Sequence, residues 1–213
     1  MNMPGFDSLI GKSLSEIIMT DLGQKTSEKI EQRLFEKYGV SLNKAVEDFP
    51  KLDSVLREFF GDGATGIEQK ILQQIMIIEQ AKKEVKGWIT IEDRTLIKLI
   101  LEAFGDDDKK NILNAVTDTS KIISTILDDC KIPQTSGYRK INSLIQSGFL
   151  IVNGHDVTQD GKRVNKYTSI FENIRIHIHK QRVIVQVQLT NESMKNSMIV
   201  QLLRGKQQLV TVE

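Results

Sequence analysis

Cysteine is nearly absent from this chain: Cys130 stands alone among 213 residues. A lone thiol excludes an intrachain disulfide, and it also excludes the thiolate pair that a soft metal ion needs. Such sparing use of cysteine fits a reducing compartment.

Long hydrophobic runs are missing as well. No apolar run approaches 18 residues, so the sequence predicts no membrane span and no membrane partner. Residues 1–18 lack the basic start and unbroken apolar core of a signal peptide, so we expect a cytoplasmic location. The composition, 27% charged and 39% hydrophobic, is typical of a folded soluble protein with one large or two small domains.

An excess of charge of one sign is also lacking, because the net charge is only +1. The charge is nevertheless uneven along the chain. Residues 131–182 contain nine Lys and Arg against three Asp and Glu, whereas residues 1–60 contain eight against ten. A local basic excess beside a near-neutral region is typical of nucleic-acid binding, although an ordinary solvated surface is the alternative interpretation.

The first hundred residues show helical spacing of apolar side chains. We expect helices within residues 6–60, a long helix over 67–86 and another over 91–104. Gly61, Gly63 and Gly66 match the spacing G-x-G-x-x-G, but a dinucleotide loop needs a strand before it. Because a helical pattern precedes these glycines, we interpret them as the end of one helix and the start of another.

The next segment has a distinctive order of elements. Helices are predicted over 106–116, 120–129 and 134–146, with a turn at Lys131-Ile132-Pro133 between the last two. Strands over 149–152 and 164–171 flank a polar loop rich in Gly and basic residues. This is the order of a winged helix-turn-helix, which presents one helix to the DNA major groove and a loop to the backbone.

The fold class expected is therefore mainly α with a small β-wing (α+β), an N-terminal helical domain followed by a winged helix-turn-helix. Alternating residues over 173–179 and 182–189 predict a hairpin that joins the sheet of the wing, and 191–204 favours a short helix, with a strand as the alternative. The predicted divisions are residues 1–66 (helical domain), 67–104 (connecting or dimerisation helices), 105–190 (winged helix) and 191–213 (C-terminal element, a further dimerisation candidate).

The third helix of this unit supplies the side chains for reading double-stranded DNA. Amide, guanidinium and hydroxyl groups near the start of a recognition helix hydrogen-bond to base edges, while lysines and arginines of a wing contact phosphates. The predicted base contacts are Gln134, Thr135, Ser136 and Arg139, and the predicted backbone contacts are Lys140, Lys162, Arg163 and Lys166. For Tyr138 two interpretations stay open: its ring packs in the core, or its hydroxyl contacts a phosphate.

The chain contains the run P-x-x-S-x-Y-R-x-I-x-x-L-x-x-x-G-x-L, which starts at Pro133. Through this run, residues of about 107–178 resemble archaeal ArsR-type winged-helix transcriptional regulators. This resemblance implies sequence-specific DNA binding as a homodimer. The N-terminal part resembles a small helical output-type domain of regulators from ammonia-oxidising archaea, through the runs LG…KIEQRL…YGV and L…FFGDGA. This second resemblance implies that the N-terminal domain binds an effector or a protein partner, whose identity is unknown.

Other chemistry receives little support. ArsR-type metal sensors have paired cysteines on the second helix, whereas here Cys130 is alone. His177 and His179 share one face of a predicted strand, but two histidines need help from a partner chain to hold zinc. We therefore predict no cofactor, no metal and no enzymatic activity. The alternative function is a winged-helix protein–protein interaction subunit of a transcription or chromatin complex.

Overall fold

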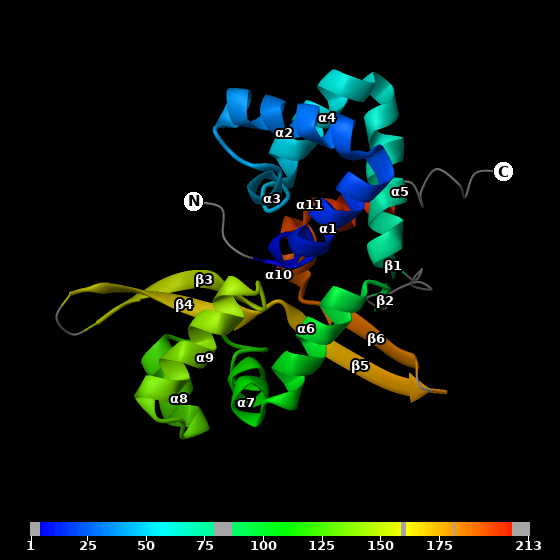
Figure 1. Cartoon of the computed structure of the whole chain (residues 1–213). Helices are drawn as coiled ribbons and strands as arrows, with labels where there is room; N and C mark the ends of the chain where they lie inside the picture. The colour runs from blue at the N-terminus through cyan, green and yellow to red at the C-terminus, as the bar shows by residue number, and fades with distance from the viewer. Residues whose placement is uncertain (1–4, 79–86, 159–160, 181, 206–213) are drawn as a thin grey trace.

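The N-terminal part of the molecule is a group of packed helices (Figure 1). The computed structural model describes residues 5–78, 87–158, 161–180 and 182–205. The helices of this group are α1 (Phe6–Leu22), α2 (Gln24–Tyr38), α3 (Leu42–Ala45), α4 (Phe49–Phe60), the 3-10 turn η1 (Gly61–Gly63) and α5 (Ala64–Ile75). Gly39, with φ 66°, ends α2. The glycine-rich turn joins two helices as predicted, and no strand precedes it within residues 5–60.

The long helix predicted over 67–86 is wrong for residues 76–78, because α5 ends at Ile75. Met76–Ile78 forms strand β1, which pairs antiparallel with β2 (Ile89–Ile91), and residues 79–86 lie outside the described ranges. A run of consecutive apolar residues fits a buried strand as well as a helix, and here the pairing with β2 decides between them. The predicted helix over 91–104 begins later, as α6 (Arg94–Gly105), where the Asp93 carboxylate accepts a hydrogen bond from the Leu96 amide at 2.8 Å.

The three helices predicted next are present. They are α7 (Asp107–Ala115), α8 (Ile123–Cys130) and α9 (Gln134–Gln146). A two-stranded antiparallel sheet follows, formed by β3 (Leu150–Val157) and β4 (Arg163–Ser169). Its strands reach further into the expected loop than predicted, because Val157 still pairs with Arg163. A single bridge between Lys121 and Tyr167 ties the segment before α8 to β4.

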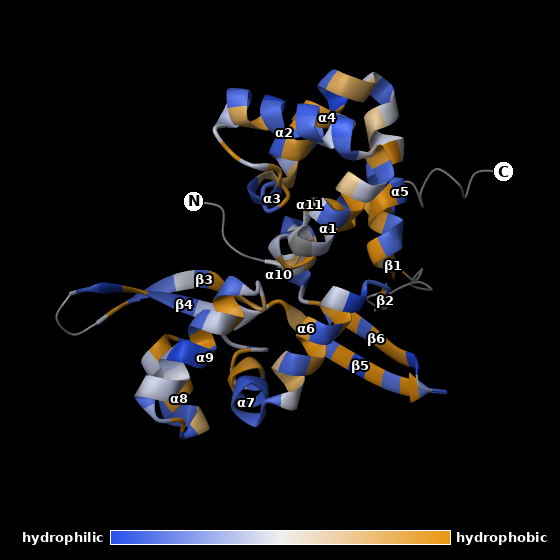
Figure 2. Cartoon of the chain, in the orientation of Figure 1, coloured by the Kyte–Doolittle hydropathy of each residue, from blue (hydrophilic) through white to orange (hydrophobic). Residues whose placement is uncertain are grey.

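The predicted hairpin exists, as β5 (Phe171–His179) and β6 (Arg182–Leu189), but its predicted partner is wrong. It joins β1 and β2 in a four-stranded sheet of order β1-β2-β6-β5, separate from β3-β4. The reason is apolar burial: Val185 and Val187 pair with Ile91 and Ile89, and all four side chains are buried. Hydrophobic and hydrophilic residues alternate along both strands of the hairpin (Figure 2).

The C-terminal segment is helical, as favoured, in two pieces: α10 (Asn191–Asn196) and α11 (Met198–Gly205). Helix α11 packs against α4 and α5, so the described end of the chain returns to the N-terminal helices. The molecule is thus a mixed α and β structure in which the strands pair antiparallel. Within the described ranges no helix combines the length and apolar character needed to cross a bilayer.

Candidate nucleic-acid interface

Helix α9 is fixed by a buried face and leaves the opposite face to solvent. Ile141 and Leu144 are buried. Gly137 allows α8 to approach, since a Cβ there would lie 2.3 Å from the Leu127 Cδ2 atom. This packing determines which side chains of α9 can meet a ligand.

Four of the six predicted α9 residues are exposed: Gln134, Thr135, Tyr138 and Arg139. Tyr138 is 44% exposed, which places its ring outside the core and leaves the phosphate contact as the role predicted for it. Ser136 is half-buried, and its hydroxyl donates to the Pro133 carbonyl at 3.1 Å within the first turn. The N-terminal half of α9 therefore presents an amide, two hydroxyls and a guanidinium to solvent.

Lys140 has another partner. Its ammonium lies 2.6 Å from both Asp106 carboxylate oxygens and 3.1 Å from Asp108, and its side chain is only 19% exposed. The hydrogen bond raises the pKa of Lys140 and lowers the pKa of Asp106. Asp106 also caps α7 by accepting from the Lys109 amide. The structure thus places Lys140 between α9 and the start of α7, where it is not free to take the phosphate contact predicted for it.

The β3-β4 hairpin extends away from the helices (Figure 1). Its end is closed by bonds between Thr158 and Lys162, including the Thr158 amide to the Lys162 carbonyl at 2.9 Å. Lys162 and Arg163 are exposed at this end. Lys166 is half-buried and, by strand alternation, lies on the face opposite to Arg163. The hairpin therefore carries two of the three predicted basic residues at its end and separates the third from them.

The thiol and the two histidines that the sequence singles out lie on different elements. Cys130 is half-buried at the end of α8, and burial raises the pKa of its thiol, so the reactive thiolate is disfavoured. His177 and His179 are exposed on β5. Over the described ranges, no group of three or more His, Cys, Asp or Glu is placed to hold a metal ion.

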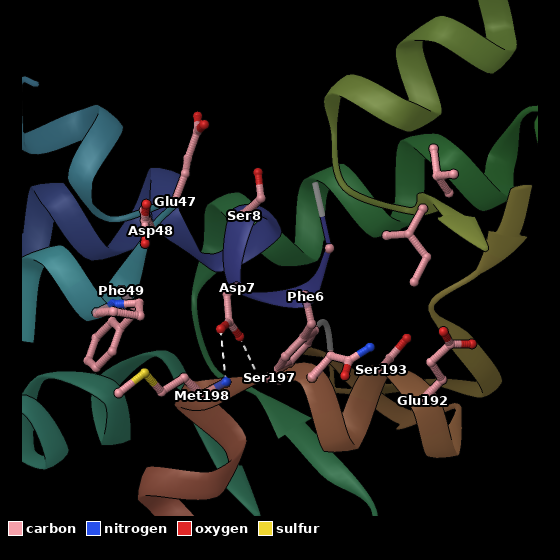
Figure 3. A pocket seen from close by; sticks show the side chains of 15 residues that line it. Phe6, Asp7, Ser8, Glu47, Asp48, Phe49, Glu192, Ser193, Ser197 and Met198 are labelled. Carbon is pink, nitrogen blue, oxygen red and sulfur yellow. Dashed lines mark hydrogen bonds between the residues drawn. The ribbon is translucent and has the colours of Figure 1, made fainter. Parts of the chain in front are cut away.

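A cavity of about 390 Å³ lies where α1, α4, β3 and α10-α11 meet (Figure 3). The Asp7 carboxylate accepts hydrogen bonds there from the Ser197 hydroxyl and, at 3.0 Å, from the Met198 amide at the start of α11. Burial raises the pKa of Asp7. Four acidic and no basic side chains line the cavity: Asp7, Glu47, Asp48 and Glu192. Sequence reasoning missed this site because its walls come from four distant segments, none of which has a motif.

In comparisons with known proteins, no family model, curated protein or solved structure matches the chain. The function must therefore be argued from the geometry of α9 and the hairpin.

Proposed function

We propose that residues 107–169 form a winged helix and that the chain is a sequence-specific, double-stranded-DNA-binding transcriptional regulator. The observation that carries this proposal is the exposed face of Gln134, Thr135 and Arg139 on a helix next to a projecting hairpin that ends in Lys162 and Arg163. The order of elements supports it: α7, the bridge at Lys121, α8, α9, then β3 and β4.

The exposed groups of α9 and of the β3-β4 hairpin have different roles in this proposal. Helix α9 enters the major groove, where a guanidinium such as that of Arg139 pairs with guanine and an amide such as that of Gln134 pairs with adenine. Lys162 and Arg163 contact phosphates, which position the protein without reading sequence. Lys140 supports the interface indirectly by holding α9 against α7. Two such units in a homodimer would read a pseudo-palindrome with half-sites about one helical turn apart. No catalytic step is part of the proposal, and a cytoplasmic location is implied by it.

The cavity of Figure 3 is the place where we expect an effector to act. It lies against Ile151 and Val152 of β3 as well as against α1 and α10-α11. A ligand bound there would touch both the N-terminal helices and the strand that follows α9. Its volume is within the range of small-molecule sites.

The direct test is binding of the full chain to a pool of genomic duplex fragments, followed by fluorescence anisotropy with a salt titration and by sequencing of the retained DNA. An enriched inverted repeat, with log affinity falling steeply with log salt, is the expected result. Absence of binding at low salt would refute the proposal in favour of a protein-interaction role. Binding without an enriched sequence would leave only a non-specific chromatin-type role.

The substitution Arg139→Ala should weaken binding to the selected sequence by about 1–3 kcal/mol and relax the base preference at one position. The guanidinium is exposed, so its removal should leave the fold intact. Anisotropy titrations on matched and single-base-changed duplexes measure both effects. Lys29→Ala, which removes one exposed positive charge from α2, is the control. Unchanged affinity and base preference in Arg139→Ala would contradict the assignment.

The hairpin should contribute affinity rather than sequence preference. Lys162→Ala and Arg163→Ala should each lower the slope of log affinity against log salt by about 1 and weaken all duplexes alike. Lys166→Ala should change the slope less, because that side chain is half-buried on the other face of β4. Equal slopes for the parent and the two end variants would show that the hairpin does not contact phosphates.

A further inference from the structure

Strand β5 is the edge of its sheet. It pairs with β6 on one side, and among the described residues no strand pairs with the other. It is nine residues long, so it presents a long row of backbone donors and acceptors. Such an edge is a template for another strand, and proteins usually shorten, charge or cover it.

The apolar face of β5 is only partly covered by its own chain. Ile174, Ile176 and Ile178 share one face of the strand by alternation. Ile176 is 40% exposed and Ile178 is 76% exposed. Ile174 and Ile176 line a groove of about 320 Å³ together with Phe104 of α6 and Leu113 of α7. Figure 2 shows the alternation of hydrophobic and hydrophilic residues along the β5-β6 hairpin.

The other face of the strand is polar. The Arg175 guanidinium lies over the Trp88 ring, 3.9 Å from its centre, and His177 and His179 follow on the same face. A strand added to the edge of β5 would therefore need apolar residues toward the α6-α7 side and polar residues on the other. Strand β5 itself has this pattern.

We propose that a second copy of this chain covers the edge, with two β5 strands paired antiparallel about a twofold axis at Ile176. In this register Ile176 lies opposite its own copy and Ile174 lies opposite Ile178 of the second chain. Arg175 then lies opposite His177. The interface is isologous, as a twofold dimer requires, and it extends the apolar face along the α6-α7 groove.

Residue type selects this register over its neighbours. With the axis at Ile176, all three isoleucines of the apolar face lie opposite isoleucines: Ile176 opposite its own copy, and Ile174 opposite Ile178. An axis at Arg175 would place that arginine opposite its own copy, and like charges directly opposite are unfavourable. An axis at His177 would place Ile174 opposite Lys180. The complete matching of isoleucines about this axis indicates a second copy of β5 rather than an unrelated strand.

The paired β5 strands would be the dimer interface of the proposed regulator. Dimerisation itself does not depend on the proposed function, but the role of the dimer in DNA binding does. Cross-linking of full-length chains without DNA tests it separately. In a Cys130→Ser background, Ile176→Cys should form a disulfide-linked dimer on mild oxidation, because opposite residues of paired strands lie within disulfide range. Ile174→Cys and Ile178→Cys should each remain monomeric on denaturing gels when alone, and should cross-link when mixed. Cross-linking of all three variants alike, or of none, would overturn the register.

A second experiment measures mass in solution by sedimentation velocity over a wide concentration range. The parent should sediment as a dimer. Ile176→Lys should sediment as a monomer, since the substitution brings two ammonium groups together on the axis. Ile77→Lys is the matched control, because Ile77 is 51% exposed on the opposite edge strand β1 and should leave the dimer intact. Circular dichroism checks that both variants fold, and the more exposed Ile178→Lys repeats the test at a position with little packing to lose.

A monomeric parent would overturn the inference, and so would dissociation by Ile77→Lys but not by Ile176→Lys. Failure of the DNA proposal gives a different result: a dimer that cross-links at Ile176→Cys yet retains no duplex. If both proposals hold, Ile176→Lys should still bind a single half-site, but with lower affinity for the full inverted repeat.

Discussion

Gly148→Ala should destabilise the protein by about 2–4 kcal/mol, a large loss for one methyl group. Gly148 follows α9 with φ +82°, a conformation that costs an alanine about 1–2 kcal/mol. The new Cβ would also lie 2.7 Å from the Gly5 carbonyl oxygen and 3.2 Å from the Leu9 amide nitrogen. These are backbone atoms joined by the first hydrogen bond of α1, so neither can move without disturbing that helix. Urea unfolding measures the loss.

Gly154→Ala is the matched control for this prediction. Gly154 has φ +88°, but a Cβ there would meet no atom within 4 Å. It should therefore lose only the conformational part, about 1–2 kcal/mol. Equal losses of unfolding free energy in Gly148→Ala and Gly154→Ala would show that the close approach of residue 148 to α1 does not contribute to stability. A larger loss at Gly148 would show that the N-terminal helices hold the end of α9, which is the mechanical link that an effector in the neighbouring cavity requires.

Elements specified by local signals could be predicted from the sequence. The bounds of α9, Gln134–Gln146, are those predicted, because Pro133 precedes it and Ser147-Gly148 ends it. The hairpin of β5 and β6 was also predicted from its alternation. The sequence did not predict which strands pair when the strands are far apart along the chain. Strand β2 at Ile89–Ile91 meets β6 near residue 186, and nothing in either segment alone identifies the other.

The same distinction applies to the candidate site. The polar character of the exposed face of α9 follows from helical spacing around buried Ile141 and Leu144. The ion pair of Lys140 could not be predicted, because Asp106 lies 34 positions earlier and reaches it only through the packing of α7 on α9. Burial of Glu68 was equally hidden, since an acidic residue in a helix is normally solvated.

Glu68→Gln should stabilise the protein at alkaline pH by about 1–3 kcal/mol. Glu68 of α5 is 2% exposed, and neither carboxylate oxygen has a hydrogen-bond partner among the described residues. Burial, together with the nearby Asp53 carboxylate, raises the pKa of Glu68 to about 8. The Arg57 guanidinium opposes this rise in the pKa of Glu68 only in part, because it bonds Asp53 at 2.8 Å and Thr65 at 3.0 Å rather than Glu68. A glutamine keeps the shape of the protonated acid and can donate its amide hydrogens toward Asp53.

The sign of the pH dependence follows from the raised pKa. Below the unfolded pKa of about 4.5 both states hold the proton, so the contribution of Glu68 to stability is fully present. As pH rises from about 4.5 toward 8, the unfolded chain releases that proton while the folded protein retains it, so the stability of the parent falls across this window. Urea unfolding across this range should therefore show parent and Glu68→Gln close together at the acid end and diverging toward the alkaline end. Glu16→Gln, at an exposed position on α1, should follow the parent throughout. Parallel curves for the parent and Glu68→Gln would mean that the carboxylate ionises in the folded protein as readily as in water, and that solvent or a partner group reaches it.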